Sequence, residues 1–229
     1  MNAAPVPPID RGMGWFGRKR SYDRSRLLDQ AMRAAGRRRH KRAISLYREI
    51  LAVDPNDLLV HRKIAPLLAR TRQPADAWES YRRAAGQLSK QGFVDQAIGV
   101  YREACVHLPR EHRLWLALAD LEVTRRRPVD AVNALLDGSR RLRSRRMWQE
   151  ALALLQHARK IQPTAFEPGY ELACLLARAG ARDRAKRILQ ELLPRARGRQ
   201  LRQVRWRLFF LSPTPAAAWR WIAAAVARG

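Results

Sequence analysis

The sequence predicts an all-α protein whose helices stack as a solenoid. Three observations support this fold class. The same residue types recur every 54 residues, apolar residues follow the i, i+3, i+4, i+7 spacing of one helix face, and proline or glycine separates the apolar stretches. No alternating strand pattern is present. With 229 residues, of which 47% are hydrophobic, the chain can form a sizeable core.

The repeat is carried by a set of positions that we expect to hold neighbouring helices together. These repeat-packing positions are Ala43, Tyr47, Pro55, Ala77, Ala97, Tyr101, Pro109, Ala131, Ala151, Pro163 and Ala185. Alanine lets the axes of packed helices approach to the short end of the usual range of roughly 8 to 10 Å. Because a single helix pair cannot bury its apolar face alone, stacked copies form the core and leave an extended concave surface.

The individual helices follow from the apolar stripes and from the residues that end them. In the first full copy we expect three helices, near residues 57–71, 75–90 and 93–106. The stripe from Leu114 to Leu121 predicts the next helix, and the register continues to Ala185. The chain is therefore expected to form about twelve antiparallel helices, three in each 54-residue unit.

Composition divides the chain into three segments. We expect a flexible basic and aromatic tail over residues 1–20, a helical repeat domain over 21–211, and an apolar C-terminal helix introduced by prolines over 212–229. The candidate hydrophobic contacts at the C-terminal end are Trp206, Phe209, Trp219, Trp221 and Ile222. They predict either a lid folded onto the last helices or a surface that meets a membrane or a partner.

The repeated positions resemble the tetratricopeptide repeat family. Ala97, Tyr101 and Pro109 have the spacing of the second helix of that repeat. The resemblance covers roughly residues 24–211, and it implies a right-handed helical solenoid, as in bacterial proteins of this type, that binds other proteins. The chain departs from simple tandem copies, because Ala77 and Ala97 stand 20 residues apart, short of the 34 residues of that repeat.

The chain is strongly basic, with 46 Lys+Arg against 20 Asp+Glu and a formal net charge of +26. If successive helices alternate in direction, every second turn lies on the same edge of the solenoid. That edge, which we call the basic edge, collects Arg37, Arg38, Arg39, Arg70, Arg72, Arg110, Arg145, Arg146, Arg178 and Arg182. We expect it to face an anionic partner. The alternatives are that these arginines serve the helix dipoles and cover apolar surface with their stems, or reflect a GC-rich genome.

The sequence carries no signature of catalysis, of a cofactor or of a metal site. The glycines from Gly12 to Gly17 match G-x-G-x-x-G, but prolines precede them where a dinucleotide site needs a strand. The two cysteines, Cys105 and Cys174, lie among apolar neighbours and fit buried side chains in a reducing compartment. We therefore expect a cytoplasmic protein that is not an enzyme and has no cofactor.

The function that this pattern favours is a non-catalytic scaffold that binds a peptide or helix of another, acidic protein in the concave groove. Two alternatives stay open. The charge could hold nucleic acid, which would make binding fall steeply with salt. The aromatic and basic ends could instead attach the chain to an anionic membrane surface. The sequence leaves the oligomeric state and the identity of the partner undecided.

Overall fold

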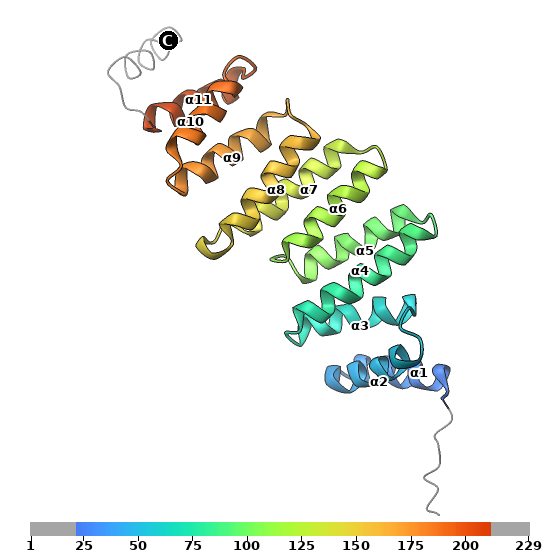
Figure 1. Cartoon of the computed structure of the whole chain (residues 1–229). Coiled ribbons are helices and arrows are strands. Elements are labelled where there is room, and N and C mark those ends of the chain that lie inside the picture. The colour runs from blue at the N-terminus through green and yellow to red at the C-terminus, as the bar shows by residue number, and fades with distance from the viewer. Residues whose placement is uncertain (1–21, 212–229) are drawn as a thin grey trace, which may run out of the picture.

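The computed structural model describes residues 22–211, and this part of the chain consists of α-helices joined by short connections. Consecutive helices run in opposite directions and stack one after another along the molecule from α1 to α11 (Figure 1). The elements are α1 (Arg24–Gly36), α2 (His40–Val53), α3 (Leu58–Arg70), α4 (Pro74–Lys90), α5 (Val94–His107), α6 (His112–Thr124), α7 (Pro128–Arg141), the 3-10 turn η1 (Arg145–Met147), α8 (Trp148–Ile161), α9 (Phe166–Arg178), α10 (Arg182–Leu192) and α11 (Gly198–Leu211).

The 54-residue repeat is confirmed by where the helices begin. Helices α2, α5 and α8 begin at residues 40, 94 and 148, while α3, α6 and α9 begin at 58, 112 and 166. Within a unit, the first and third helices also touch each other, as α3 touches α5 and α6 touches α8. The packing units are therefore α3 to α5, α6 to α8 and α9 to α11. Helices α1 and α2 stand before them as a separate pair.

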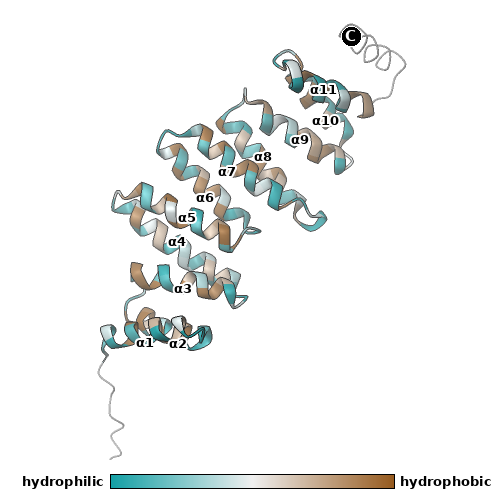
Figure 2. Cartoon of the chain, turned by 180° about the vertical axis from the view of Figure 1, so that it is seen from behind, coloured by the Kyte–Doolittle hydropathy of each residue, from teal (hydrophilic) through white to brown (hydrophobic). Residues whose placement is uncertain are grey.

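The predicted packing alanines lie in the core. Ala43, Ala97 and Ala151 are at most 1% exposed, and Ala77, Ala131 and Ala185 are fully buried. Tyr47 and Tyr101 fill the space one turn later on the same helices and are buried as well. Each helix carries hydrophobic residues on one side and hydrophilic residues on the other (Figure 2), so the alanines set how closely the helices approach.

Eight of the ten connections within residues 22–211 are of two kinds. Tight turns contain one residue in the left-handed backbone region, which is Arg38, Arg72 or Arg126 in three of them and Gly92 or Gly180 in two others. Longer connectors, at residues 54–57, 108–111 and 162–165, each contain a proline. Left-handed backbone is costly for any residue except glycine, so three turns accept an arginine at a cost that neighbouring packing must offset.

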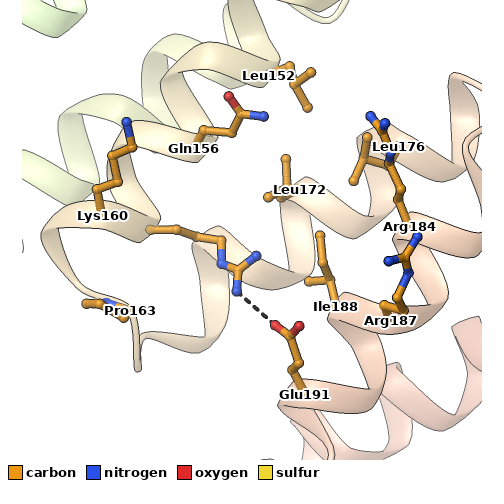
Figure 3. A pocket seen from close by; sticks show the side chains of 11 residues that line it. Leu152, Gln156, Lys160, Pro163, Leu172, Leu176, Arg184, Arg187, Ile188 and Glu191 are labelled. Carbon is orange, nitrogen blue, oxygen red and sulfur yellow. Dashed lines mark hydrogen bonds and ion pairs between the residues drawn. The ribbon is translucent and has the colours of Figure 1, made fainter.

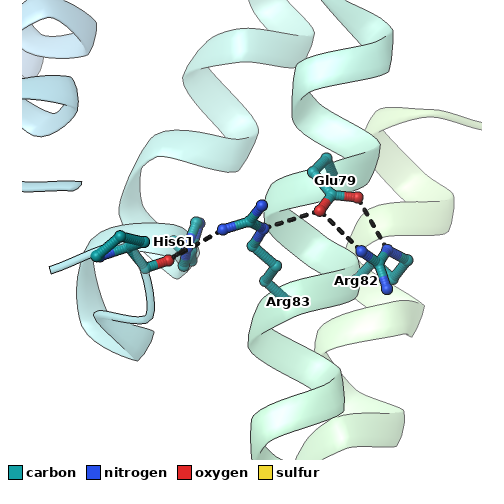
Figure 4. A network of polar contacts seen from close by, with 5 residues as sticks. His61, Glu79, Arg82 and Arg83 are labelled. Atoms are coloured by element: carbon teal, nitrogen blue, oxygen red, sulfur yellow. Dashed lines mark hydrogen bonds and ion pairs between the residues drawn. The ribbon is translucent and has the colours of Figure 1, made fainter. Parts of the chain in front are cut away.

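The first two proline connectors are held by side chains of helices that follow them. Nε2 of His61 lies 2.9 Å from the carbonyl oxygen of Pro55, and Nη1 of Arg83 donates to the same oxygen over 3.2 Å (Figure 4). One unit later, the indole Nε1 of Trp115 donates to the carbonyl of Pro109 over 3.1 Å. Because a carbonyl only accepts, Nε2 of His61 carries the proton. Equivalent positions, 61 and 115, thus tie the first two connectors to the core, and the third connector has Gly169 at that position.

Residue sizes compensate between equivalent positions in successive units. A Cβ atom built on Gly138 would lie 2.5 Å from Cγ of Trp115, so glycine is needed where tryptophan packs. In the next unit, Gly169 stands at the tryptophan position and Leu192 at the glycine position. A Cβ on Gly169 would meet the Leu192 side chain at 3.1 Å. The large side chain thus moves from the first member of the pair to the second, and each time it packs against a glycine.

The described part thus confirms an all-α repeat fold with helices at the predicted places. The three helices expected near 57–71, 75–90 and 93–106 are α3, α4 and α5. The segments predicted as a tail (1–20) and as a C-terminal helix (212–229) lie outside the described residues, and the division into three segments stays a prediction.

Candidate functional site: two grooves and a basic edge

The alternation of helix directions places every second connection on one edge of the molecule. The connections α1–α2, α3–α4, α5–α6, α7–α8 and α9–α10 lie on the left in Figure 1, and the others lie on the right. All ten arginines of the basic edge are at or near these left-hand connections, and all ten side chains are exposed. None of them forms an ion pair with another residue in the range 22–211.

Some of the arginines on the opposite edge are compensated. Arg125 and Arg127, in the α6–α7 connection, both pair with Asp95 at the start of α5, at 2.8 and 3.3 Å. Arg24 pairs with Asp57 at 2.6 Å near the α2–α3 connection. Arg126 in the same connection, and Arg195 and Arg197 in the α10–α11 connection, are exposed and form no ion pair within residues 22–211. Uncompensated positive charge therefore lies on both edges, and the ten arginines of the basic edge are the larger group.

One end of the basic edge contains a small hollow between α1 and α2. Its volume is about 160 Å³. The side chains around it are Gln30, Arg33, Ala34, Arg37, Arg39 and Arg42, with no acidic residue among them. The first turn of α2 also lacks an acidic residue, whereas α5 has Asp95 and α8 has Glu150 there. Positive charge is thus concentrated at a helix N-terminus that would favour negative charge.

One groove lies between α8 and α10, with α9 beneath it. Its volume is about 580 Å³. We call it the α8–α10 groove, and it is lined by Leu152, Gln156, Arg159, Lys160, Pro163, Leu172, Leu176, Arg184, Arg187, Ile188 and Glu191. Figure 3 shows Leu172 and Leu176 from α9 between the two walls. Its volume lies in the range of sites that hold a ligand or an anchoring segment.

The walls of the α8–α10 groove are basic. Arg159 and Lys160 come from α8, and Arg184 and Arg187 come from α10. The only acidic lining residue is Glu191, and its Oε2 already accepts a hydrogen bond of 3.0 Å from Arg159 across the groove (Figure 3). A leucine floor between basic walls can take apolar side chains in its middle and carboxylates at its sides.

A second groove occupies the same place one repeat earlier. It lies between α5 and α7 over α6, and its volume is about 350 Å³. We call it the α5–α7 groove, and it is lined by Arg102, Cys105, Val106, Trp115, Leu118, Glu122, Asp130, Asn133, Ala134, Asp137 and Arg141. Nine of these residues are 54 positions before a residue of the α8–α10 groove, so the two grooves are copies of one feature.

Aromatic residues gather on the last described helix. Trp206 and Phe210 are 45% and 60% exposed, and their ring centroids lie 4.8 Å apart in an edge-to-face arrangement with Phe209 beside them. Trp219, Trp221 and Ile222, which we also predicted as hydrophobic contacts, lie outside the described residues. The choice between a lid and a membrane or partner surface therefore stays open.

The cysteines are in apolar surroundings. Burial raises the pKa of the Cys105 thiol to about 12 and also raises the pKa of the Cys174 thiol. Both stay protonated at neutral pH, which makes them poor nucleophiles. Between residues 22 and 211, no three His, Cys, Asp or Glu side chains are grouped so as to hold a metal ion. No helix in that range is long and apolar enough to cross a bilayer.

The sequence predicted the basic edge but not the grooves. The edge follows from counting turns, because alternate turns of an antiparallel stack share one side. The grooves depend on positions where successive units differ, such as Leu68, Glu122 and Leu176, whereas the repeat is recognised from positions that stay the same. The signal in the sequence that could have revealed the α5–α7 groove is Glu122, a charged residue at a position where the other two units have leucine.

No protein-family model matches the sequence, and no curated protein matches it either. Among solved structures, it is similar to PilW, a type IV pilus biogenesis factor, with 18% identity over 89% of this chain and 92% of that chain and a TM-score of 0.44. A tetratricopeptide repeat protein from Parabacteroides merdae shares 12% identity over 82% and 86% of the two chains, with a TM-score of 0.30. Such low TM-scores say nothing about function. The repeated antiparallel helices themselves make the fold a tetratricopeptide-like solenoid.

Proposed function

We propose that this chain is a non-catalytic protein-interaction scaffold that binds an acidic segment of a partner protein in the α8–α10 groove. The observation that carries the proposal is the leucine floor of that groove between four basic side chains. A segment with apolar residues on one side and carboxylates on the other would match both parts of the groove.

The basic edge supports the same partner chemistry. Arg182 of the edge precedes Arg184 of the groove by two residues in the first turn of α10, with Asp183 between them, so the edge and the groove meet at this helix end. Exposed charges of this kind accelerate encounter with an oppositely charged partner more than they add affinity. We therefore assign steering to the edge and anchoring to the groove.

The proposal is tested by affinity capture from an extract of the source cells after nuclease treatment. The full chain is compared with a variant that carries Arg184→Glu and Arg187→Glu. The matched control carries Arg199→Glu and Arg202→Glu, which make the same charge change at exposed positions of α11 outside the groove. A partner retained by the control and lost by the groove variant supports the proposal. Equal retention by both variants contradicts it.

Nucleic acid is a second candidate ligand, because ten exposed arginines without an acidic partner would also suit phosphates. The two candidates differ in salt dependence. A protein that contacts six to ten phosphates loses roughly 10³ to 10⁵ in affinity between 50 and 200 mM salt. Binding that falls this steeply and disappears with nuclease would favour nucleic acid. Retention of one discrete protein at physiological salt would favour the scaffold.

A further inference from the structure

The two grooves share a frame but differ in charge. Val106, Asp130 and Asn133 in the α5–α7 groove correspond to Lys160, Arg184 and Arg187 in the α8–α10 groove, 54 residues later. The floor keeps a leucine in both, at positions 118 and 172. The repeat has therefore kept the position of the groove and changed the charge of its lining. Three carboxylates and two arginines line the α5–α7 groove, whereas four basic side chains and one carboxylate line the α8–α10 groove.

The floor of the α5–α7 groove also contains a buried carboxylate. Glu122 stands where the preceding and following units have Leu68 and Leu176. Its side chain is 1% exposed, and its Oε1 accepts a hydrogen bond of 2.6 Å from Arg102. Its other oxygen, Oε2, is buried and has no hydrogen-bond partner. A buried carboxylate oxygen without a donor is costly, so packing alone would favour leucine there.

The neighbouring side chains leave room for another cation. Asp130 forms no ion pair within residues 22–211. Oδ1 of Asp137 pairs with Nη1 of Arg140 on the same helix, but over the long distance of 3.5 Å. Arg102 already forms an ion pair with Glu122, and the Arg102 side chain is 58% exposed at the edge of the groove. Arg141 also lines the groove but forms no ion pair with either carboxylate. A donor that displaced the side chains covering Oε2 of Glu122 would therefore find that oxygen and the carboxylate of Asp130 without an ion-pair partner in the described residues.

We propose that the α5–α7 groove binds an arginine or lysine side chain of the same partner segment whose acidic part occupies the α8–α10 groove. This inference rests on the proposed function, because it deepens the chemistry of that partner. The partner is then bipolar, with a basic residue on one side of its acidic stretch. Two equivalent grooves of opposite sign would fix the direction in which the segment lies along the solenoid.

The experiment uses two fluorescein-labelled peptides that share an acidic stretch with a leucine stripe. They differ only at one end, which carries two arginines in one peptide and two glutamines in the other. Each peptide is made in two versions, one with this end at the N-terminus and one with it at the C-terminus. Fluorescence anisotropy measures their affinity for the full chain, for Glu122→Leu, for Glu122→Gln, and for the variant with Arg184→Glu and Arg187→Glu. Thermal unfolding of each protein shows whether it is folded.

We expect the arginine peptide to bind the full chain about tenfold more tightly than the glutamine peptide, as for one hydrogen-bonded charge pair. Glu122→Gln keeps the shape of the side chain and removes its charge, so both peptides should bind it equally. Glu122→Leu should give the same result with an unchanged or raised Tm, because leucine stands there in the other units.

Two results would overturn this inference without affecting the proposed function. One is an arginine advantage that is absent from the full chain or that persists in Glu122→Gln. The other is a lowered Tm for Glu122→Leu, which would make the carboxylate a structural group. In both cases, weaker binding of both peptides to the Arg184→Glu, Arg187→Glu variant would leave the proposed function standing. Peptides that bind this variant as well as the full chain, or bind neither, would overturn both proposals.

Discussion

Trp115 and Gly138 show that the size of one residue in this repeat depends on the size of the residue it packs against. The next unit keeps the same stacking with Gly169 and Leu192 in exchanged sizes. In both pairs one member is large and the other is glycine, so the large side chain occupies the space beside the glycine. The substitution of one member alone therefore disturbs the interface between helices, while the exchange of both members preserves it.

Gly138→Ala is expected to lower the free energy of unfolding by about 1–3 kcal/mol, because the added methyl group would overlap the Trp115 ring. The control is Gly86→Ala in α4, where a Cβ meets nothing within 4 Å. It should raise stability by about 0.5–1 kcal/mol, since alanine favours helix interiors. Chemical denaturation of both variants measures the difference. A stable Gly138→Ala protein would show that this contact is not tight.

The same pair allows a double-variant test. Trp115→Gly combined with Gly138→Leu installs the pair that the following unit uses. We expect the double variant to be more stable than the sum of the two single variants predicts, because each single change leaves either a void or a clash. Additive losses in denaturation experiments would mean that the two positions do not compensate.

The buried alanines could be predicted from the sequence, because the same residue returns in every unit. The Trp115 and Gly138 pair could not, because each residue looks irregular until its contact is known. Glu122 was missed for a related reason, since its charge interrupts a leucine position that the repeat otherwise keeps. Repetition predicts shared packing, whereas the candidate site depends on where the copies differ.

Helix α2 differs from its counterparts in the charge at its N-terminus. Lys41 occupies the position at which α5 has Asp95. A helix N-terminus carries partial positive charge, so lysine there is unfavourable and aspartate is favourable. The hollow between α1 and α2 adds further arginines at the same place. This end of the molecule is thus less well stabilised electrostatically than the equivalent end of α5.

Lys41→Asp should raise the free energy of unfolding by about 0.3–1 kcal/mol at low salt, and the gain should shrink at high salt as the charges are screened. The reciprocal variant, Asp95→Lys, should be destabilising, since it also removes the partner of Arg125 and Arg127. Thermal unfolding at two salt concentrations measures both effects. A Lys41→Asp protein with lowered stability would show that these positive charges are compensated in the free chain.

Glu79 joins neighbouring turns of α4 and supplies a pH dependence. The hydrogen bond from Arg82, followed by that from Arg83, lowers the pKa of Glu79 to about 2 (Figure 4). A lowered pKa in the folded state means that its stabilisation is present above the ordinary value of 4.5 and is lost as pH falls toward about 2. The contribution is modest because the side chain is 39% exposed.

Glu79→Gln is therefore expected to be less stable than the natural chain at pH 7 and to approach it in stability as pH falls from 4.5 to 2. Thermal unfolding across that pH range gives the comparison. Glu49→Gln, at an exposed position of α2 where the structure gives no ion pair, serves as the control and should show no such convergence. A constant difference for Glu79→Gln at all pH values would exclude the ionic origin.

The whole molecule is a stack of units that share one packing and carry different charges. Its architecture was predictable, since length, repeat and helix spacing fix the order and direction of the helices. The left and right edges followed from that order. The charge reversal between the grooves was not predictable without the structure, because it requires knowing which residues of three separate helices line one hollow.

The first measurement to make is site-specific photo-crosslinking of the full chain in its source cells. A crosslinking residue replaces Gln156, which is exposed and lines the α8–α10 groove, and in a second protein it replaces Asp29, which is exposed on α1. If the groove anchors an acidic partner, position 156 gives one discrete protein adduct that the Arg184→Glu, Arg187→Glu changes abolish, and position 29 gives none. Equal adducts at both positions, or adducts to nucleic acid only, would contradict binding of a protein in this groove.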